Sequence, residues 1–391
     1  MLIFTLWSLP AFAWNAIAHQ TMGRVSLQDV SGPWGLRTPC SIRPLSSLLE
    51  KLGKMDESLG DFWHFSDFLK INPTIAWDTL DPREQGKTSV TPLEILSFHS
   101  TDPDDGRDKD LIIRDSKGRP HYAFRDQFWF GSLQGGNSQA FRHLEKPPFS
   151  WKYRESTFGF PFRAVGEATS RAEIYYQTAL LAFALEEDYW GWRFLAGSFH
   201  YLQDLENPYH AAQITPELLK KGFKAYWSWG RNQKKGLMPT LAHVVSNSHR
   251  FMETYLEQTP NYEPLKGDDV LPVPSIHDLS LQVRDESSRF FPALTGLVGQ
   301  ITNEKLIGPH LFNSNTLPYD DTQLYLDNES PNFAEANEQI RKIVAERFAA
   351  TGRVLRTETK LLLEERKSPL EAKQKLQEIA RLLALHPQKE P

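Results

Sequence analysis

Histidine and carboxylate side chains recur at helical spacing at two places in the chain. His200 and Asp204 lie four residues apart, and His249 and Glu253 repeat that spacing. Residues four apart share one face of a helix, so each pair can bind a single ion. Imidazole and carboxylate are ligand types that zinc accepts, and a carboxylate has two oxygens with which to bridge two ions. A single pair of this kind more often forms an ordinary helix contact, but two pairs favour a metal site.

A further histidine follows the first pair closely. Pro208 ends the helix that carries His200 and Asp204, so the chain can turn and bring His210 to the same cluster from the loop beyond. The resulting pattern is His-x3-Asp-x5-His. It is the most specific motif in the sequence.

The elements that must position these residues are predicted to be helices. Apolar residues recur at helical spacing from 167 to 205, and an acidic break at 186–188 predicts two antiparallel helices there. Further helices are predicted at 16–27, 239–257, 332–356 and 370–385. The stretch 71–161 is rich in Pro, Gly and Asp and is predicted to be mostly loop. The fold class is therefore all-α, a multi-helix bundle with long loops around a metal cleft.

Composition limits the classes of function. The chain has 391 residues, of which 40% are hydrophobic, enough for a substantial core. A net charge of -5 gives no strong cationic field, which argues against a protein that grips duplex nucleic acid through many phosphates. Cys40 is the only cysteine, so the core or bound metals, rather than an intramolecular disulfide, must stabilise the fold.

The first residues are typical of an export signal. An apolar run from Leu2 to Phe12 ends in Ala11-Phe12-Ala13, which fits a signal-peptidase site and predicts Trp14 as the mature N-terminus. No Lys or Arg precedes Trp14, so a start codon further upstream, or a buried strand, remains an alternative. We expect a signal peptide at 1–13, one helical domain at 14–385, a frayed tail at 386–391, and a secreted or periplasmic protein.

Across 14–257 the sequence resembles zinc-dependent phospholipase C and the single-strand-specific zinc nucleases, a family of trinuclear zinc phosphodiesterases. The His-x3-Asp-x5-His motif carries the resemblance, together with the run from Trp14 to His19, which is similar to the family's mature N-terminus. In that family the first residue is a Trp whose amino group and carbonyl oxygen ligate zinc. Such ligation requires removal of a signal peptide, in agreement with the predicted cleavage.

The resemblance implies three Zn²⁺ ions as cofactors and a set of ligands for each. One ion would be held by Asp78, His99, His200 and Asp204, a second by His210, His249 and Glu253, and a third by Trp14 and His19, with Asp204 as a bridge. The family also places an aspartate shortly before the histidine that His99 matches. Asp78 fits the surrounding residues best and Asp81 fits the spacing better, so both stay open, with Asp78 preferred. Asp78 is then the candidate to orient or deprotonate the attacking water.

The same resemblance implies a zinc-dependent phosphoric ester hydrolase. The run 207–212 and Glu253 favour a phospholipase C, which cleaves the glycerol-side phosphate ester of phospholipids, with a phospholipid or membrane surface as its partner. His19 follows Trp14 as closely as in the nuclease branch, so a nuclease or 3'-nucleotidase acting on single-stranded nucleic acid is the alternative. A non-catalytic zinc-binding protein of the same fold is the second alternative.

Three aromatic residues lie between the two helices that carry the ligand pairs. Tyr226, Trp227 and Trp229 fall in a stretch that reads as a loop. They could form an interfacial lip toward lipid, or stack nucleic-acid bases, or simply pack in the core. The sequence leaves these three interpretations open.

Overall fold

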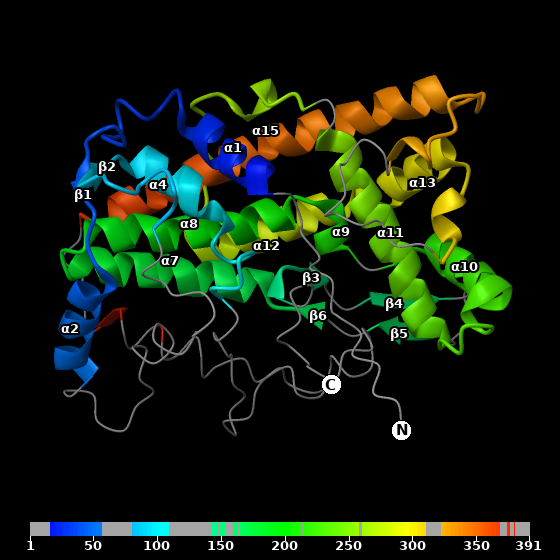
Figure 1. Cartoon of the computed structure of the whole chain (residues 1–391), viewed down its shortest axis with the longest axis horizontal. Coiled ribbons are helices and arrows are strands. Elements are labelled where there is room, and N and C mark those ends of the chain that lie inside the picture. The colour runs from blue at the N-terminus through cyan, green and yellow to red at the C-terminus, as the bar shows by residue number, and fades with distance from the viewer. Residues whose placement is uncertain are drawn as a thin grey trace.

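Helices make up most of the computed structural model, and the strands are short (Figure 1). The model describes residues 16–56, 80–108, 142–146, 149–152, 159–162, 165–212, 214–257, 260–309, 322–367, 374–375 and 379. The predicted all-α fold is confirmed. The expected signal peptide lies outside the described residues, and so does nearly all of the helix expected at 370–385.

A hairpin of two long helices occupies the centre. These are α7 (Ala168–Ala184) and α8 (Asp188–Leu205), with the break between them where the sequence predicts it. Gly197 allows the two helices to approach closely, because a Cβ there would lie 2.4 Å from Cδ1 of Tyr175. Every residue of α8 after the first is buried. A helix buried on all sides can hold polar side chains only where other elements supply partners for them.

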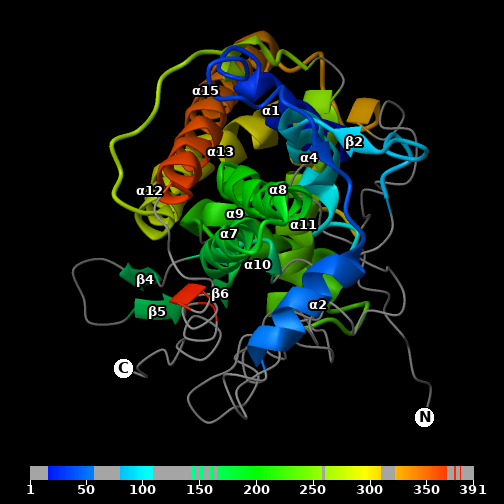
Figure 2. The same cartoon turned by 90° about the vertical axis from the view of Figure 1, so that its left-hand side faces the viewer.

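Other helices enclose α8, as the end-on view in Figure 2 shows. The helices that pack against it include α1 (Ala16–Leu27), α4 (Pro92–Phe98), α12 (Ile276–Ser288) and α15 (Phe333–Glu365). The bounds of α1 agree with the prediction. Helix α15 continues past the predicted end at 356, because Leu361, Leu362 and Leu363 add apolar contacts to the same core. A further helix, α2 (Leu45–Asp56), packs its leucines on this core as well.

A second apolar core lies at the other end of the molecule, to the right in Figure 1. It is formed by α9 (Pro208–Ala211), α10 (Pro216–Ala225), α11 (Leu237–Glu257), α13 (Phe291–Thr302) and the first half of α15. Helix α11 starts slightly before the predicted position, and its Pro239 sits in the first turn, where a missing N–H costs little. The loop expected around Trp227 is instead a π-helical turn, η3 (Tyr226–Gly230), that continues α10.

The described part of the region predicted to be loop contains an α-helix, α4, that the sequence analysis missed. Thr91 caps α4 by accepting a hydrogen bond from the backbone N–H of Glu94, whose carboxylate accepts one from the backbone N–H of Thr91. This capping box, with Pro92 at the first helical position, is a readable start signal. The region also contributes at least one strand to each short antiparallel pairing among the described residues. These pairings are β1 (Cys40–Ser41) with β2 (Ser89–Val90), β3 (Glu145–Lys146) with β6 (Val165–Gly166), and β4 (Phe149–Lys152) with β5 (Gly159–Phe162).

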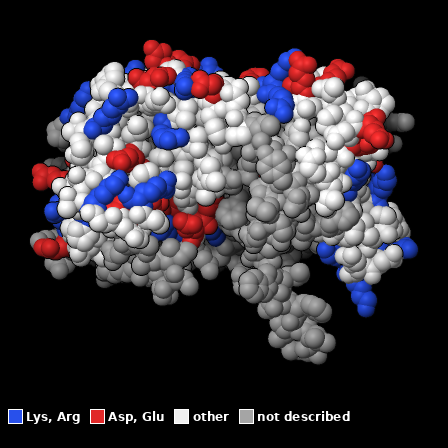
Figure 3. Space-filling model, turned by 45° about the horizontal axis from the view of Figure 1, so that its top comes forward, with Lys and Arg blue, Asp and Glu red and all other residues white. Residues whose placement is uncertain are grey.

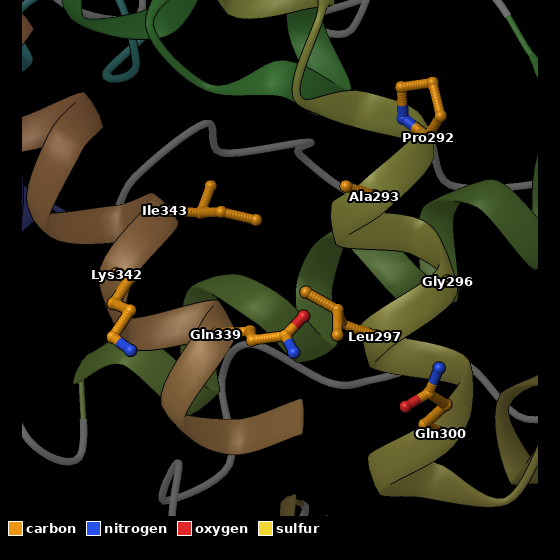
Figure 4. Close-up of a pocket in the computed structure, with 8 residues that line it drawn as sticks. All are labelled: Pro292, Ala293, Gly296, Leu297, Gln300, Gln339, Lys342 and Ile343. Atoms are coloured by element: carbon orange, nitrogen blue, oxygen red, sulfur yellow. The ribbon is translucent and has the colours of Figure 1, made fainter. Parts of the chain in front are cut away.

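A surface groove of about 470 Å³ separates α13 from α15 (Figure 4). Its lining residues are Pro292, Ala293, Gly296, Leu297, Gln300, Gln339, Lys342 and Ile343. None of them is a histidine or a carboxylate, so the groove offers no metal-binding chemistry. Within the described parts of the chain, no helix combines the length and apolarity needed to cross a bilayer.

Glu358 generates a prediction about stability. This α15 carboxyl is fully buried, and burial raises its pKa well above 4.5, offset only by the Ser198 hydroxyl. The unfolded chain ionises Glu358 above its ordinary pKa while the folded chain keeps it protonated, so this residue lowers stability as pH rises, by about 1.4 kcal/mol per pH unit. Urea unfolding of Glu358→Gln between about pH 5 and pH 7 should show a smaller loss of stability than wild type.

Glu364, exposed on the same helix, provides the control. Glu364→Gln should follow the wild-type dependence on pH. Parallel curves for wild type and Glu358→Gln would contradict the assignment of the buried charge.

Candidate metal centre

Buried histidine and carboxylate side chains meet at the C-terminal end of α8. In the part of the chain that the structure describes, three groups have ligand atoms within 4.8 Å of one another: His19 with Asp104 and His200, His143 with His200 and Asp204, and His210 with His249 and Glu253. They come from α1, α8, α9, α11 and two segments of the long connecting region. Groups of this composition could hold metal ions.

The tightest group surrounds one oxygen of Asp204. Oδ2 of Asp204 lies 2.9 Å from Nδ1 of His143 and 3.2 Å from Nε2 of His200. The two ring nitrogens are 2.7 Å apart. The helical spacing of His200 and Asp204 thus places both on one face, as the sequence predicts, and His143 is added from the segment before β3.

The other oxygen of Asp204 faces α1. Oδ1 lies 3.6 Å from Nε2 of His19, and that nitrogen is 3.8 Å from Oδ2 of Asp104. Oδ1 of Asp104 is 3.6 Å from Nε2 of His200. Among the described residues, Nε2 of His19 and Oδ1 of Asp204 are buried without a hydrogen-bond partner. Such atoms are costly inside a protein unless something outside the polypeptide satisfies them.

The remaining group joins α9 to α11. Nε2 of His210 lies 3.0 Å from Nε2 of His249, which is 2.7 Å from Oε1 of Glu253. Asn207 caps α9 and Pro208 starts it, so a tight turn aims His210 back toward the end of α8. The ring of Tyr209 stacks on that of His249 with centroids 5.6 Å apart.

Hydrogen bonds at the outer nitrogen fix the orientation of three rings. Nδ1 of His200 donates to the carbonyl oxygen of Ser100 at 2.8 Å, Nδ1 of His210 donates to the carbonyl oxygen of His143, and Nδ1 of His19 donates to Oε1 of Gln203. This pattern assigns the proton to Nδ1 in each ring and leaves the lone pair of Nε2 facing the cluster. Second-shell bonds of this kind characterise metal-ligating histidines.

The electrostatic environment favours the neutral form of the His19, His143, His210 and His249 rings. Burial lowers the pKa of His19, His143 and His210 well below 6.5, and neighbouring rings lower it further. Burial also lowers the pKa of His249 to about 3, with help from nearby cations. A neutral imidazole is the form that binds a metal.

The carboxylates experience the opposite shift. Burial raises the pKa of Asp204 well above 3.8, and the charges of Glu253 and Asp108 raise it further. Burial raises the pKa of Glu253 in the same way, and Arg250 offsets only part of the shift. Clustered buried carboxylates are unfavourable as anions unless a cation lies among them. A divalent ion would reverse this penalty.

Two cationic side chains flank the α9–α11 group. Lys146 is buried beside Phe291, with Nζ 5.9 Å from the ring centroid, and burial lowers its pKa to about 8. The charges of Lys146 and Arg250 are both near enough to lower the pKa of His249. The sequence analysis did not identify either residue. Positive charge next to a metal-binding group suits an anionic ligand.

Most of the expected ligands that fall within the described residues come together. Those brought into the three groups are His19, His200, Asp204, His210, His249 and Glu253. His210, His249 and Glu253 form a group apart from His200 and Asp204, whereas His19, expected with Trp14 at a third ion, groups with His200 and Asp104. Trp14 and Asp78 lie outside the described residues.

His99 does not join the cluster. Its Nε2 lies 3.0 Å from Oε2 of Glu84 and its Nδ1 lies 3.2 Å from the Asp102 carboxylate. Asp102 in turn pairs with Arg193 at 2.9 Å. The ring is therefore saturated by a separate buried network of charges. Asp81, the alternative aspartate, pairs with Arg83 near the surface and belongs to none of the groups.

His143 and Asp104 are the cluster members that sequence reasoning missed. Asp104 lies in the Asp-Pro-Asp-Asp-Gly turn that follows His99, and this turn brings Asp104 near His200 of α8. His143 follows a long connecting stretch and has no partner at a regular spacing. Only the tertiary fold brings it to His200.

Metal content should separate these assignments. His143→Ala removes a ring that touches two cluster members, so purified protein should carry markedly less metal by mass spectrometry. His99→Ala should keep its metal and lose about 2 to 4 kcal/mol of stability in urea, because Glu84 and Asp102 lose a buried partner. His277, exposed on α12, provides the control, and His277→Ala should change neither quantity. Metal loss in His99→Ala but not in His143→Ala would reverse the assignment.

Compared with known proteins, the sequence matches no family model and no curated protein.

Proposed function

We propose that this protein is a secreted or periplasmic zinc-dependent phosphoric ester hydrolase, related in its chemistry to zinc-dependent phospholipase C and the single-strand-specific nucleases. The observation that carries the proposal is the orientation of the rings of His19, His200 and His210. Each is held through Nδ1 by an acceptor outside the cluster and presents Nε2 to it. A structural cluster of histidines would not need three rings aimed in this way.

Three ions account for the donor atoms. His200 belongs to two of the three groups, but its Nε2 can bind only one ion. These two groups would therefore correspond to one ion at His200 and a second ion on the other side of Asp204. The first ion would be held by His143, His200, Asp204 and Asp104, the second by His210, His249 and Glu253, and the third by His19 and Asp204, with Trp14 added by the resemblance. Nitrogen and carboxylate donors in sets of three or four suit Zn²⁺.

Zinc ions bound at these residues would supply a water that ionises at neutral pH and would neutralise charge on the oxygens of a phosphate ester. The protein's own residues orient that chemistry. Asp204 directs Oδ2 toward His143 and Oδ1 toward His19, which is the arrangement a bridging carboxylate requires. Lys146 and Arg250 place positive charge beside His249, where it would attract the phosphate. Asp78 remains the proposed group that orients or deprotonates water, and Asp104 supplies the carboxylate contact to His200.

Of the candidate substrates, we favour a phospholipid. The sequence around His210 and the presence of Glu253 rather than Asp both favour cleavage of the glycerol-side phosphate ester. Single-stranded nucleic acid is the alternative, supported by the short spacing from Trp14 to His19. A zinc-binding protein without activity is the second alternative, and direct assay separates all three.

Hydrolysis of phosphatidylcholine and of single-stranded DNA, measured in parallel with and without a chelator, tests the proposal. We expect chelator-sensitive release of phosphocholine, together with bound zinc detected by mass spectrometry. His200→Ala and Asp204→Ala should lose bound metal and at least a hundredfold in activity, because each removes a donor that nothing else replaces. His277→Ala should retain both.

Chelator-sensitive cleavage of DNA alone would move the protein to the nuclease alternative. Full zinc occupancy without hydrolysis of either substrate would leave only the non-catalytic alternative. A wild-type protein that binds no zinc would remove the proposal altogether.

A further inference from the structure

The segment formed by α10 and η3, with the residues that follow to 235, combines exposed apolar rings with a concentration of positive charge. We refer to residues 216–235 as the basic knob. Phe223 is 42% exposed and Trp227 is 61% exposed. They lie four positions apart, on the same side of the continuous helix formed by α10 and η3. Few large hydrophobic side chains in the described residues are as exposed as these two.

These exposed rings are not a by-product of core packing. Trp229, two positions along, is buried, and its Nε1 donates to the carbonyl oxygen of Ile307 at 2.7 Å. Trp229 therefore anchors the π-helical turn, while Trp227 points away from the core. The earlier alternatives for the aromatic stretch divide accordingly, with Trp229 in the core and Trp227 available to a partner.

Charge on the knob is strongly one-sided. The segment contains Lys220, Lys221, Lys224, Arg231, Lys234 and Lys235 against the single acidic residue Glu217, although the whole chain carries a net charge of -5. Lys220, Lys224, Arg231 and Lys234 are exposed, and Lys224 is the one among them paired with Glu304, at 2.8 Å. On the face in Figure 3, blue atoms gather without red neighbours at the lower right, the end where Figure 1 places α10.

We propose that the basic knob docks the protein on an anionic lipid surface. Tryptophan and phenylalanine side chains insert at the boundary between head groups and acyl chains. Lysine and arginine around them are attracted to negatively charged head groups and can keep their amines in the polar layer. Phe223 and Trp227 supply the inserted part, and the surrounding cations supply the attraction.

The geometry of Trp227 favours lipid over nucleic acid. The guanidinium of Arg231 lies 5.0 Å from the centroid of the Trp227 ring. The ring of Tyr226 packs edge to face on the Trp227 ring, with ring centroids 5.6 Å apart. Stacking of bases needs free ring faces along a groove, whereas here one indole face is covered and the neighbouring indole, Trp229, is buried. A membrane interface needs only the outward edge of the ring.

The knob packs on α11, the helix that carries His249 and Glu253 of the metal centre. Helix α10 packs on α11 at Gly222, where a Cβ would lie 2.5 Å from Cδ1 of Leu241. Trp229 contacts the ring of His243 on α11 with centroids 5.1 Å apart. His249 follows six residues later, about 9 Å along the helix axis. Docking would thus hold the metal centre near the lipid surface; this consequence rests on the proposed function, whereas docking itself does not require hydrolysis.

Vesicle co-sedimentation of the zinc-loaded full chain tests the proposal, with intact lipid quantified after each run. Wild type should bind equimolar phosphatidylcholine and phosphatidylserine vesicles about tenfold more tightly than phosphatidylcholine alone, and added salt should weaken this binding. Trp227→Ser and the double variant Arg231→Gln, Lys234→Gln should each weaken binding about tenfold while keeping wild-type zinc content. The matched controls are Leu324→Ser, an exposed leucine elsewhere, and Lys360→Gln, an exposed lysine on α15.

The outcomes separate docking from hydrolysis. Indifference of wild type to anionic lipid, or equal effects of knob and control substitutions, would overturn the proposal. So would knob variants that bind vesicles normally but lose binding to a single-stranded DNA oligonucleotide. Vesicle binding without hydrolysis of lipid or DNA would support docking and remove the proposed function. Hydrolysis of dispersed short-chain phospholipid without vesicle binding would overturn docking and support the proposed function.

Discussion

The carboxylate of Asp204 is fully buried among histidine rings, and the arrangement of the centre follows from that constraint. Burial and the charges of Glu253 and Asp108 oppose its ionisation, and Nδ1 of His143 and Nε2 of His200 lie against its Oδ2. A protein retains such a group where a cation is bound or a proton is held. A hydrogen bond from Nδ1 of His200 to the carbonyl oxygen of Ser100 orients Nε2 of the same ring toward this carboxylate. Such outer hydrogen bonds are typical of metal-binding histidines, so the arrangement favours a bound cation.

Much of the fold could be predicted because its largest helices carry clear apolar patterns. The hairpin of α7 and α8 and the helix from 16 to 27 follow the expected boundaries. Prediction failed where local signals competed with composition. The stretch 71–161 reads as loop from its Pro and Gly content, yet the capping box at Thr91 starts a helix there. Around Trp227 the aromatic sequence has no clear period, and only packing of Trp229 on its neighbours selects a π-helical turn.

The candidate site divides in the same way. Ligands related by helical spacing, such as His200 with Asp204, could be found from sequence because the backbone geometry alone places them together. His143 could not, since its contact with His200 depends on how a long connection folds. His99 shows the opposite difficulty, because its match to a histidine of the family gave no indication of Glu84, whose carboxylate contacts the His99 ring in the folded chain. Sequence spacing identifies pairs on one element, whereas membership of a cluster is decided by tertiary contacts.

The hydrogen bond between His19 and Gln203 joins residues 184 positions apart in the chain. Closing so long a segment has an entropic cost, which the contacts of α1 with α4, α8 and α15 must offset. One donor of the centre therefore depends on the docking of α1 against helices that lie far along the chain. Ion occupancy at His19 would consequently report whether α1 is docked in the folded protein.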